Sequence, residues 1–105
     1  MLRPQEEVRM DADRPAAIAT LLREAELAHA EHEAKDLGGV YDQEWPRWYA
    51  TYAVEHDLAT ILGHDVSIDR LTTFLADGYA AFSSAEPRPT QPWAEYTAAR
   101  ISAEL

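Results

Sequence analysis

The chain has 105 residues, a length that fits one domain with a single hydrophobic core. It contains no cysteine, which excludes disulfides, thiolate metal sites and cysteine nucleophiles. Its net charge of -10, from 19 acidic and 9 basic residues, disfavours direct binding to nucleic acid or to a membrane surface.

No stretch approaches the ~20 apolar residues of a membrane span, and the N-terminus lacks the pattern of a signal peptide. The sequence therefore predicts a cytoplasmic protein. Eight of the nine basic residues are arginine and alanine is abundant, which is typical of a GC-rich bacterial genome.

Residues 1–12 are polar and show no periodic apolar face, so we expect a flexible arm before a single helical domain over residues 13–105. The first helix is predicted over 15–35, with Asp13 as its N-cap and Pro15 in its first turn. Gly38 and Gly39 end it. One side of this helix gathers Ile18, Leu21, Leu22, Ala25, Ala28, His29 and His32.

The second helix is predicted from Trp45 to Gly63, with Asp42 as its cap and Pro46 in its first turn. Its two faces are both apolar, which is typical of a central helix in a bundle or of a helix at an oligomer interface. One face holds Trp45, Trp48, Tyr49, Tyr52, His56 and Ala59, and the opposite face holds Val54, Leu58 and Ile61.

A third helix is predicted over 68–82 with Ser67 as its cap, and a fourth follows a proline-containing loop and starts near Pro92. No segment shows the alternating pattern of a strand. The predicted fold is all-α, a small bundle of about four helices with a long first helix and a central second helix.

The four histidines all fall within residues 29–64, and this is the first candidate for chemistry. His29 and His32 share a helix face, and an antiparallel second helix would bring His56 toward them. A mononuclear metal site would then use His29, His32 and His56, with Glu33 or Glu26 completing the set. The alternative is that these histidines only make hydrogen bonds in the core or at an interface.

Aromatic residues are the second candidate, because four of the ten lie between residues 45 and 52. The side chains of Trp45, Trp48, Tyr49 and Tyr52, with His56, could form a partner surface or line a pocket for an apolar or cationic small molecule. They could equally fill the core of a small domain.

The segment from Ala28 to Glu33, followed by Gly38 to Ala50 and by the Trp93-to-Tyr96 pair, resembles short bacterial all-helical proteins. Those proteins combine an H-x-x-H/E segment, a W-P-x-W-Y-A segment and a final W-x-x-Y helix. The resemblance implies a compact helical domain with a shared surface around the histidine and tryptophan segments. It implies no reaction and no catalytic residue.

No G-x-S-x-G, P-loop or G-x-G-x-x-G motif is present. The leading prediction is thus a non-enzymatic module for protein interaction or small-ligand binding, with a homo-oligomer or a protein as possible partner and no cofactor. The first alternative is a divalent-metal-dependent enzyme or metal-binding protein that uses the histidine cluster. A more remote one is an acidic mimic that inhibits a nucleic-acid-binding protein.

Overall fold

The computed structural model describes the backbone of residues 4–105 and the side chains of residues 13–105. Within this range the chain is all-helical and has no strand, which confirms the predicted fold class. The five helices are α1 (Pro4–Lys35), α2 (Trp45–Glu55), α3 (Leu58–Leu62), α4 (Ile68–Ser84) and α5 (Trp93–Glu104). The predicted count of four differs because the second predicted helix is divided into α2 and α3.

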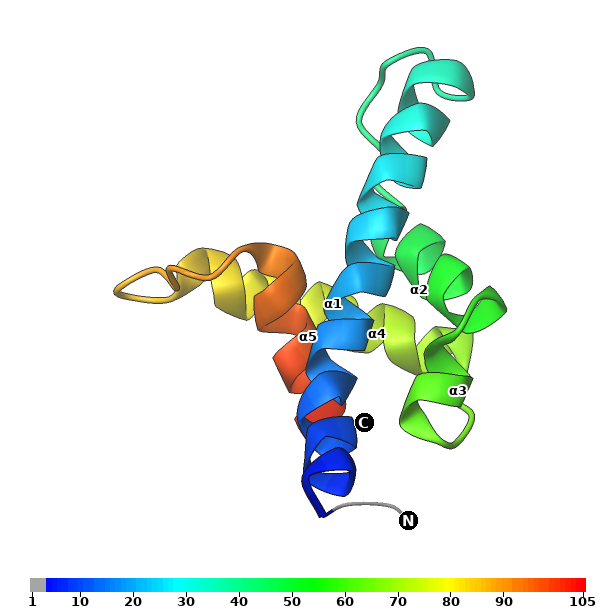
Figure 1. Cartoon of the computed structure of the whole chain (residues 1–105). Helices are drawn as coiled ribbons and strands as arrows, with labels where there is room; N and C mark the ends of the chain where they lie inside the picture. Colours follow the sequence, from blue (N-terminus) through cyan, green and yellow to red (C-terminus); the bar gives the residue numbers. More distant parts are fainter. Residues whose placement is uncertain (1–3) are drawn as a thin grey trace.

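The helices pack as two main pairs, α1 with α5 and α2 with α4, and α1 also contacts α2 and α3. In Figure 1, α4 crosses behind α1, while α2 and α3 lie to one side of α1 and α5 lies on the other. The upper end of α1 and the tip of the α4–α5 hairpin project in different directions from this crossing. The second predicted helix therefore packs beside the other helices and is not surrounded by them, as a central helix of a bundle would be.

The core is aliphatic. Its largest fully buried side chains come from α1, α3, α4 and α5, and each contributes about 1.5–3 kcal/mol by leaving water. They are Ile18, Leu22, Leu58, Leu71, Leu75 and Ile101. Tyr49 is the one aromatic residue among the buried residues of the described part, whereas the tryptophans pack against the core and stay partly exposed. Most of the aromatic side chains are thus not needed to fill the centre of the domain.

The first helix begins earlier than the sequence predicted. Its backbone is helical from Pro4, so the prediction of a helix start at Pro15 with Asp13 as N-cap is wrong. Pro15 lies inside the helix, which tolerates it at the loss of one backbone hydrogen bond. Residues 4–14 contain no glycine, and nothing in that segment ends a helix.

The break between α2 and α3 lies at His56 and Asp57. His56 leaves the helical conformation, with φ -106° and ψ -114°, and its Nδ1–H donates to the carbonyl oxygen of Tyr52 over 2.7 Å. A side chain that binds a backbone carbonyl competes with the helix in this way. The break turns Leu58 into the core, which a continuous helix would have placed opposite Tyr49.

Three of the predicted helix signals are confirmed. Ser67 caps α4, with its Oγ accepting the Arg70 N–H over 3.1 Å. Gly63 ends α3 in the left-handed region at φ 82°, where a residue without a Cβ is favoured. Pro46 lies in the first turn of α2.

Candidate ligand-binding site

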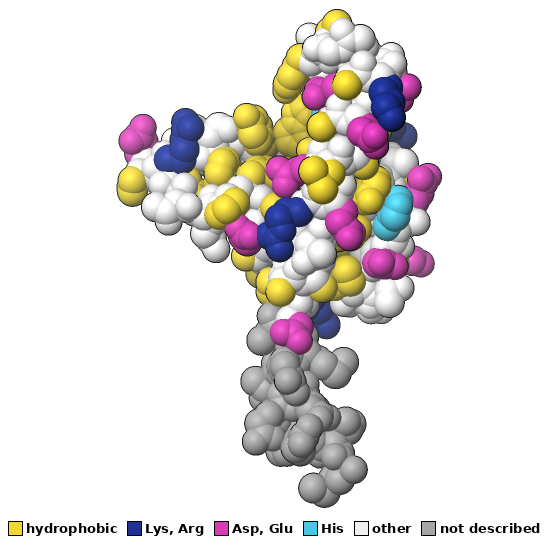
Figure 2. All heavy atoms as spheres, turned by 45° about the horizontal axis from the view of Figure 1, so that its top comes forward, with side chains coloured by type: hydrophobic (Ala, Val, Ile, Leu, Met, Phe, Trp, Pro, Cys, Tyr) yellow, Lys and Arg dark blue, Asp and Glu magenta, His cyan; other side chains and the backbone are white. Residues whose placement is uncertain are grey.

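A cavity of about 320 Å³ opens between α1, α2, α4 and α5, and we call it the aromatic pocket. Its lining combines five aromatic side chains with two carboxylates and one imidazole. The residues are Glu26, His29, Glu33, Tyr41, Trp45, Tyr49, Tyr79 and Trp93. Figure 2 shows hydrophobic side chains gathered in the hollow between the α4–α5 arm and the upper end of α1.

The rings of the aromatic pocket meet at nearly right angles. Trp45 lies at its centre and makes edge contacts with three rings, at interplanar angles of 87° to Tyr49, 75° to Tyr79 and 83° to Trp93. Tyr49 and Trp93 also meet at 85°. Such contacts are favourable because the positive edge of one ring faces the negative face of another. The rings are thereby held in different orientations along the cavity.

Helix periodicity explains why these rings come together. Trp45 and Tyr49 are four residues apart and share one side of α2, which packs against α4. Tyr79 comes from α4 and Trp93 from the first turn of α5. Three helices that are distant in the sequence therefore each contribute aromatic walls to one cavity.

A buried hydrogen-bond network fixes the α1 side of the pocket. His29 Nε2 donates to Asp42 Oδ2 over 2.9 Å, and both side chains are buried. The other Asp42 oxygen accepts the Glu44 N–H, while the Asp42 N–H donates to Glu33 Oε2 over 3.0 Å. Asp42 was predicted as the cap of the second helix, and the structure instead has Glu44 at that position, without a side-chain cap. The network joins the loop before α2 to α1.

Asp42 is held as a carboxylate. Burial raises the pKa of Asp42, but the hydrogen bonds from His29 and from the Glu44 N–H favour the charged form, and the net result is a pKa below the ordinary value. Its negative charge keeps the His29 ring fixed against Tyr49, whose centroid lies 5.0 Å from that of the imidazole.

Negative charge dominates the electrostatics of the pocket. Burial raises the pKa of Tyr49 to about 12, and the nearby carboxylates of Glu26 and Glu33 act in the same direction. The pKa of Glu26 is also raised, mainly by burial, although Arg23 opposes this. No lysine or arginine of the described residues lines the cavity.

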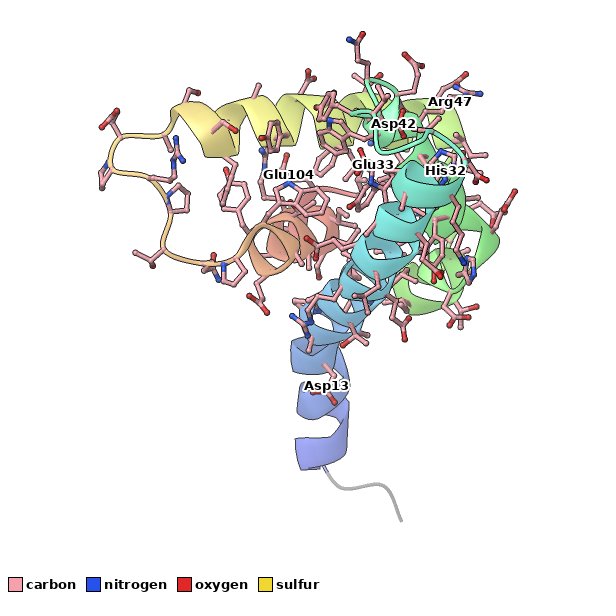
Figure 3. The ribbon with its side chains drawn as sticks, turned by 90° about the horizontal axis from the view of Figure 1, so that it is seen from above. Asp13, His32, Glu33, Asp42, Arg47 and Glu104 are labelled. Carbon is pink, nitrogen blue, oxygen red and sulfur yellow. The ribbon has the colours of Figure 1, made fainter. Side chains whose placement is uncertain are left out.

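Arg23 acts on Glu26 from outside the cavity lining, and its guanidinium pairs with the Glu95 carboxylate. Figure 3 shows Glu33 on the side of α1 that faces α4 and α5, whereas His32 lies on the other side, toward Arg47. Both carboxylates line the pocket with the aromatic rings, and Glu33 Oε1 lies 4.0 Å from Nδ1 of His29, the imidazole of the same lining.

The outer side of α2 carries a different arrangement, which we call the outer stack. Its four rings follow one another with small interplanar angles: His32 on Trp48 at 26°, Trp48 on Tyr52 at 18°, and Tyr52 on His56 at 15°. A shallow cavity of about 420 Å³ lies beside it, with Arg47, Glu44 and Glu55 among its lining residues. Each ring covers a face of the next, and the surrounding charges are of both signs.

The predicted ligand or partner surface is thus divided between two sides. Of its five residues, Trp45 and Tyr49 line the aromatic pocket, whereas Trp48, Tyr52 and His56 belong to the outer stack. The pocket also contains Tyr41, Tyr79 and Trp93, which are not among the site residues predicted from the sequence. The Pro92–Trp93 start of the last helix, which repeats the Trp45–Pro46 pattern, is the one signal that could have drawn attention to Trp93.

The geometry argues against the predicted metal set. His29 is bonded to Asp42, His32 Nδ1 lies 2.9 Å from Asp36 Oδ2, and His56 is bonded to the Tyr52 carbonyl. Among the residues whose side chains are described, no group of three or more histidines and carboxylates is arranged to hold a metal ion. Glu26 and Glu33 lie with His29 at the aromatic pocket, and His32 and His56 lie outside it.

Comparisons with protein-family models, with curated proteins and with solved structures gave no significant match. Across the described residues, none of the helices has the length and apolar character that crossing a membrane requires.

Proposed function

We propose that the protein is a non-enzymatic small-ligand-binding module and that the aromatic pocket holds its ligand. The observation that carries the proposal is the convergence of five aromatic side chains from three helices and one loop on a single open cavity. Ligand sites are concave and mostly apolar, with a few polar groups that fix orientation, and the composition of this lining agrees with that description.

The exposure of the rim supports a binding role over a packing role. Tyr41 is 67% exposed and Tyr79 is 46% exposed, although both line the cavity. The aliphatic core is complete without them. A ligand that fills the cavity would cover the exposed apolar surface of these two side chains, and the removal of that surface from water would favour binding.

The polar groups of the pocket hold its wall in place. The imidazole of His29 is buried and already bonded to Asp42, an arrangement that orients the ring. Glu33 likewise uses one oxygen to accept the Asp42 N–H. These side chains stabilise the wall of the cavity.

The alternative of an acidic mimic of nucleic acid has less support. On the face that Figure 2 shows, acidic side chains lie singly among basic and apolar ones, whereas a nucleic-acid mimic needs an ordered acidic strip.

The test uses the three tryptophans of the chain as reporters. Trp45 and Trp93 line the aromatic pocket, whereas Trp48 belongs to the outer stack, so the three indole N–H resonances of labelled protein distinguish the two sides. A panel of small cationic, neutral and anionic compounds is titrated while these three signals are recorded.

We expect at least one compound of the panel to shift the Trp45 and Trp93 signals in a saturable way and to leave Trp48 in place. A Tyr79→Ala variant, altered at a half-exposed rim position, should weaken that response while the other amide signals of the protein stay dispersed. The proposal is wrong if the panel leaves both pocket indoles unmoved, or if every response is confined to Trp48.

A further inference from the structure

We infer that the ligand of the aromatic pocket is a small organic cation with an alkylated ammonium centre, such as a choline-like molecule. The inference rests on the proposed function and adds the chemical class of the ligand. It comes from the combination of aromatic walls at right angles with two carboxylates in a cavity that no lysine or arginine of the described side chains lines.

The aromatic walls suit a cation because the face of an aromatic ring carries partial negative charge. Attraction to an ammonium centre is strongest for tryptophan, and boxes of aromatic rings are the usual recognition device for quaternary ammonium groups. The pocket offers two tryptophans, Trp45 and Trp93, at 83° to each other, with Tyr49 near perpendicular to both.

The carboxylates decide the sign of the charge. Glu26 and Glu33 lie two turns apart on the same side of α1 and both act on Tyr49, so their fields overlap in the cavity. An anionic ligand would meet repulsion from both, whereas a cation would relieve it. The net charge of -10 adds a general attraction for cations that salt screens.

The predominantly aromatic lining of the pocket favours an alkylated ammonium over a primary one. A primary ammonium carries three donors, each of which needs an acceptor when it leaves water. Aromatic rings make up five of the eight lining residues, and their faces offer contact surface for methyl groups. An alkylated centre needs no such partners and buries its methyl groups against the rings.

The size and charge of the site favour a free small molecule. A cavity of about 320 Å³ lies at the low end of the roughly 300–1,000 Å³ typical of ligand sites. In a phosphocholine headgroup the phosphate lies next to the ammonium group, and in this pocket it would approach Glu26 or Glu33. We therefore expect choline itself to bind better than its phosphate ester.

The experiment compares three compounds by isothermal titration calorimetry on the full chain. Choline is the cation, 3,3-dimethylbutan-1-ol is its neutral isostere of the same shape, and phosphocholine carries the added phosphate. We expect choline to bind about tenfold or more tightly than the neutral alcohol, since the cation–π and carboxylate attractions are lost with the charge. Phosphocholine should bind more weakly than choline.

A matched pair of variants on α1 locates the effect. Glu26→Gln removes one charge from the pocket, and we expect it to weaken choline binding about threefold to tenfold and to leave the neutral alcohol unaffected. Glu24→Gln removes the same charge from an exposed position of the same helix outside the pocket, and it should change the affinity less than about twofold. Because both positions are exposed, both variants should fold.

The outcomes distinguish the inference that the ligand is a cation from the proposal that the aromatic pocket binds a ligand. Equal binding of choline and its neutral isostere, tighter binding of phosphocholine, or equal effects of the two glutamine variants would overturn the cation inference. The cation inference also fails if choline does not bind while other compounds of the panel shift the Trp45 and Trp93 indoles. In that case the proposal that the aromatic pocket binds a ligand is retained. If no compound moves those indoles, the proposed function fails as well.

Discussion

The two sides of α2 carry aromatic residues from the same short segment, yet they differ in nearly every physical respect. On the inner side, Trp45 and Tyr49 meet rings from other helices at nearly right angles around a cavity with two carboxylates and, among the described residues, no lysine or arginine in its lining. On the outer side, Trp48 and Tyr52 stack on each other, beside charges of both signs. In the outer stack each contact covers a face of both rings, whereas an edge-to-face contact covers a face of only one of its two rings.

This difference shows that aromatic density alone does not define a site. The neighbouring elements decide the outcome: α4 and α5 supply Tyr79 and Trp93 to the inner side, and α1 adds Glu26 and Glu33. The outer stack has one ring from α1, His32, and the others follow each other along α2 and at its end.

The largest expected difference between the two sides is in stability. Tyr49 is 8% exposed and contacts rings on α1, α2 and α5, so Tyr49→Ala should lower the free energy of unfolding by about 3 kcal/mol. Tyr52 is only partly buried, and Tyr52→Ala should cost about 1 kcal/mol. Urea denaturation of both variants measures this, and equal losses would erase the distinction between the sides.

A second comparison uses the two histidine–aspartate pairs. His29–Asp42 is buried and its Asp42→Asn variant should lose about 1–3 kcal/mol, because a buried hydrogen bond to a charged group is lost. His32–Asp36 is more exposed, and Asp36→Asn should cost less than about 0.5 kcal/mol. Thermal or chemical denaturation at pH 7 gives both values.

The pH dependence of the Asp42→Asn variant has a defined sign. The folded-state pKa of Asp42 is below the ordinary value of 3.8, so its contribution is fully present above that value and is lost as pH falls through the lower one. The natural protein should therefore lose stability below about pH 4 more steeply than the variant. Parallel curves for the two proteins would show that Asp42 is not held as a carboxylate by this network.

A tryptophan-to-phenylalanine exchange on each side of α2 compares the contributions of the two sides to choline affinity. Phenylalanine attracts cations less than tryptophan does, so Trp45→Phe should weaken choline binding about threefold. The same exchange at Trp48, on the outer stack, should leave the affinity within about twofold. Calorimetric titration of the two variants measures the contrast. A larger loss of choline affinity in Trp48→Phe than in Trp45→Phe would place the binding site at the outer stack and contradict the proposal.

The smallest expected effect is a pH dependence of the affinity. The pKa of Glu26 is raised above its ordinary value of 4.5, and protonation removes the charge that attracts a cation. Choline binding should therefore weaken as the pH is lowered from 7 toward the ordinary value of 4.5, and the Glu26→Gln variant should lack this change. A tighter interaction at pH 5 would contradict the sign.

Sequence patterns predicted the helical class and most helix boundaries, because these depend on local signals such as Ser67 and Gly63. They missed the break at His56, which depends on a side-chain hydrogen bond to the Tyr52 carbonyl. They also missed the start of α1, because Pro15 was interpreted as a first-turn proline although the helix passes through it.

The candidate site was predicted only in part. Periodicity placed Trp45, Trp48, Tyr49 and Tyr52 on one broad face, and only packing against α4 divides that face into an inner and an outer side. Tyr79 and Trp93 are separated from Trp45 by more than thirty residues of sequence. Their contacts with it depend on the crossing of helices, which no local pattern records.

The most direct test of the account is a crystal structure of the protein with choline. The account predicts that the ammonium centre lies in the aromatic pocket, against the faces of Trp45 and Trp93 and beside Glu26. Choline bound against Trp48 and Tyr52, or a pocket closed by movement of Tyr79 without choline in it, would contradict the central claim that the inner side of α2 is the binding side.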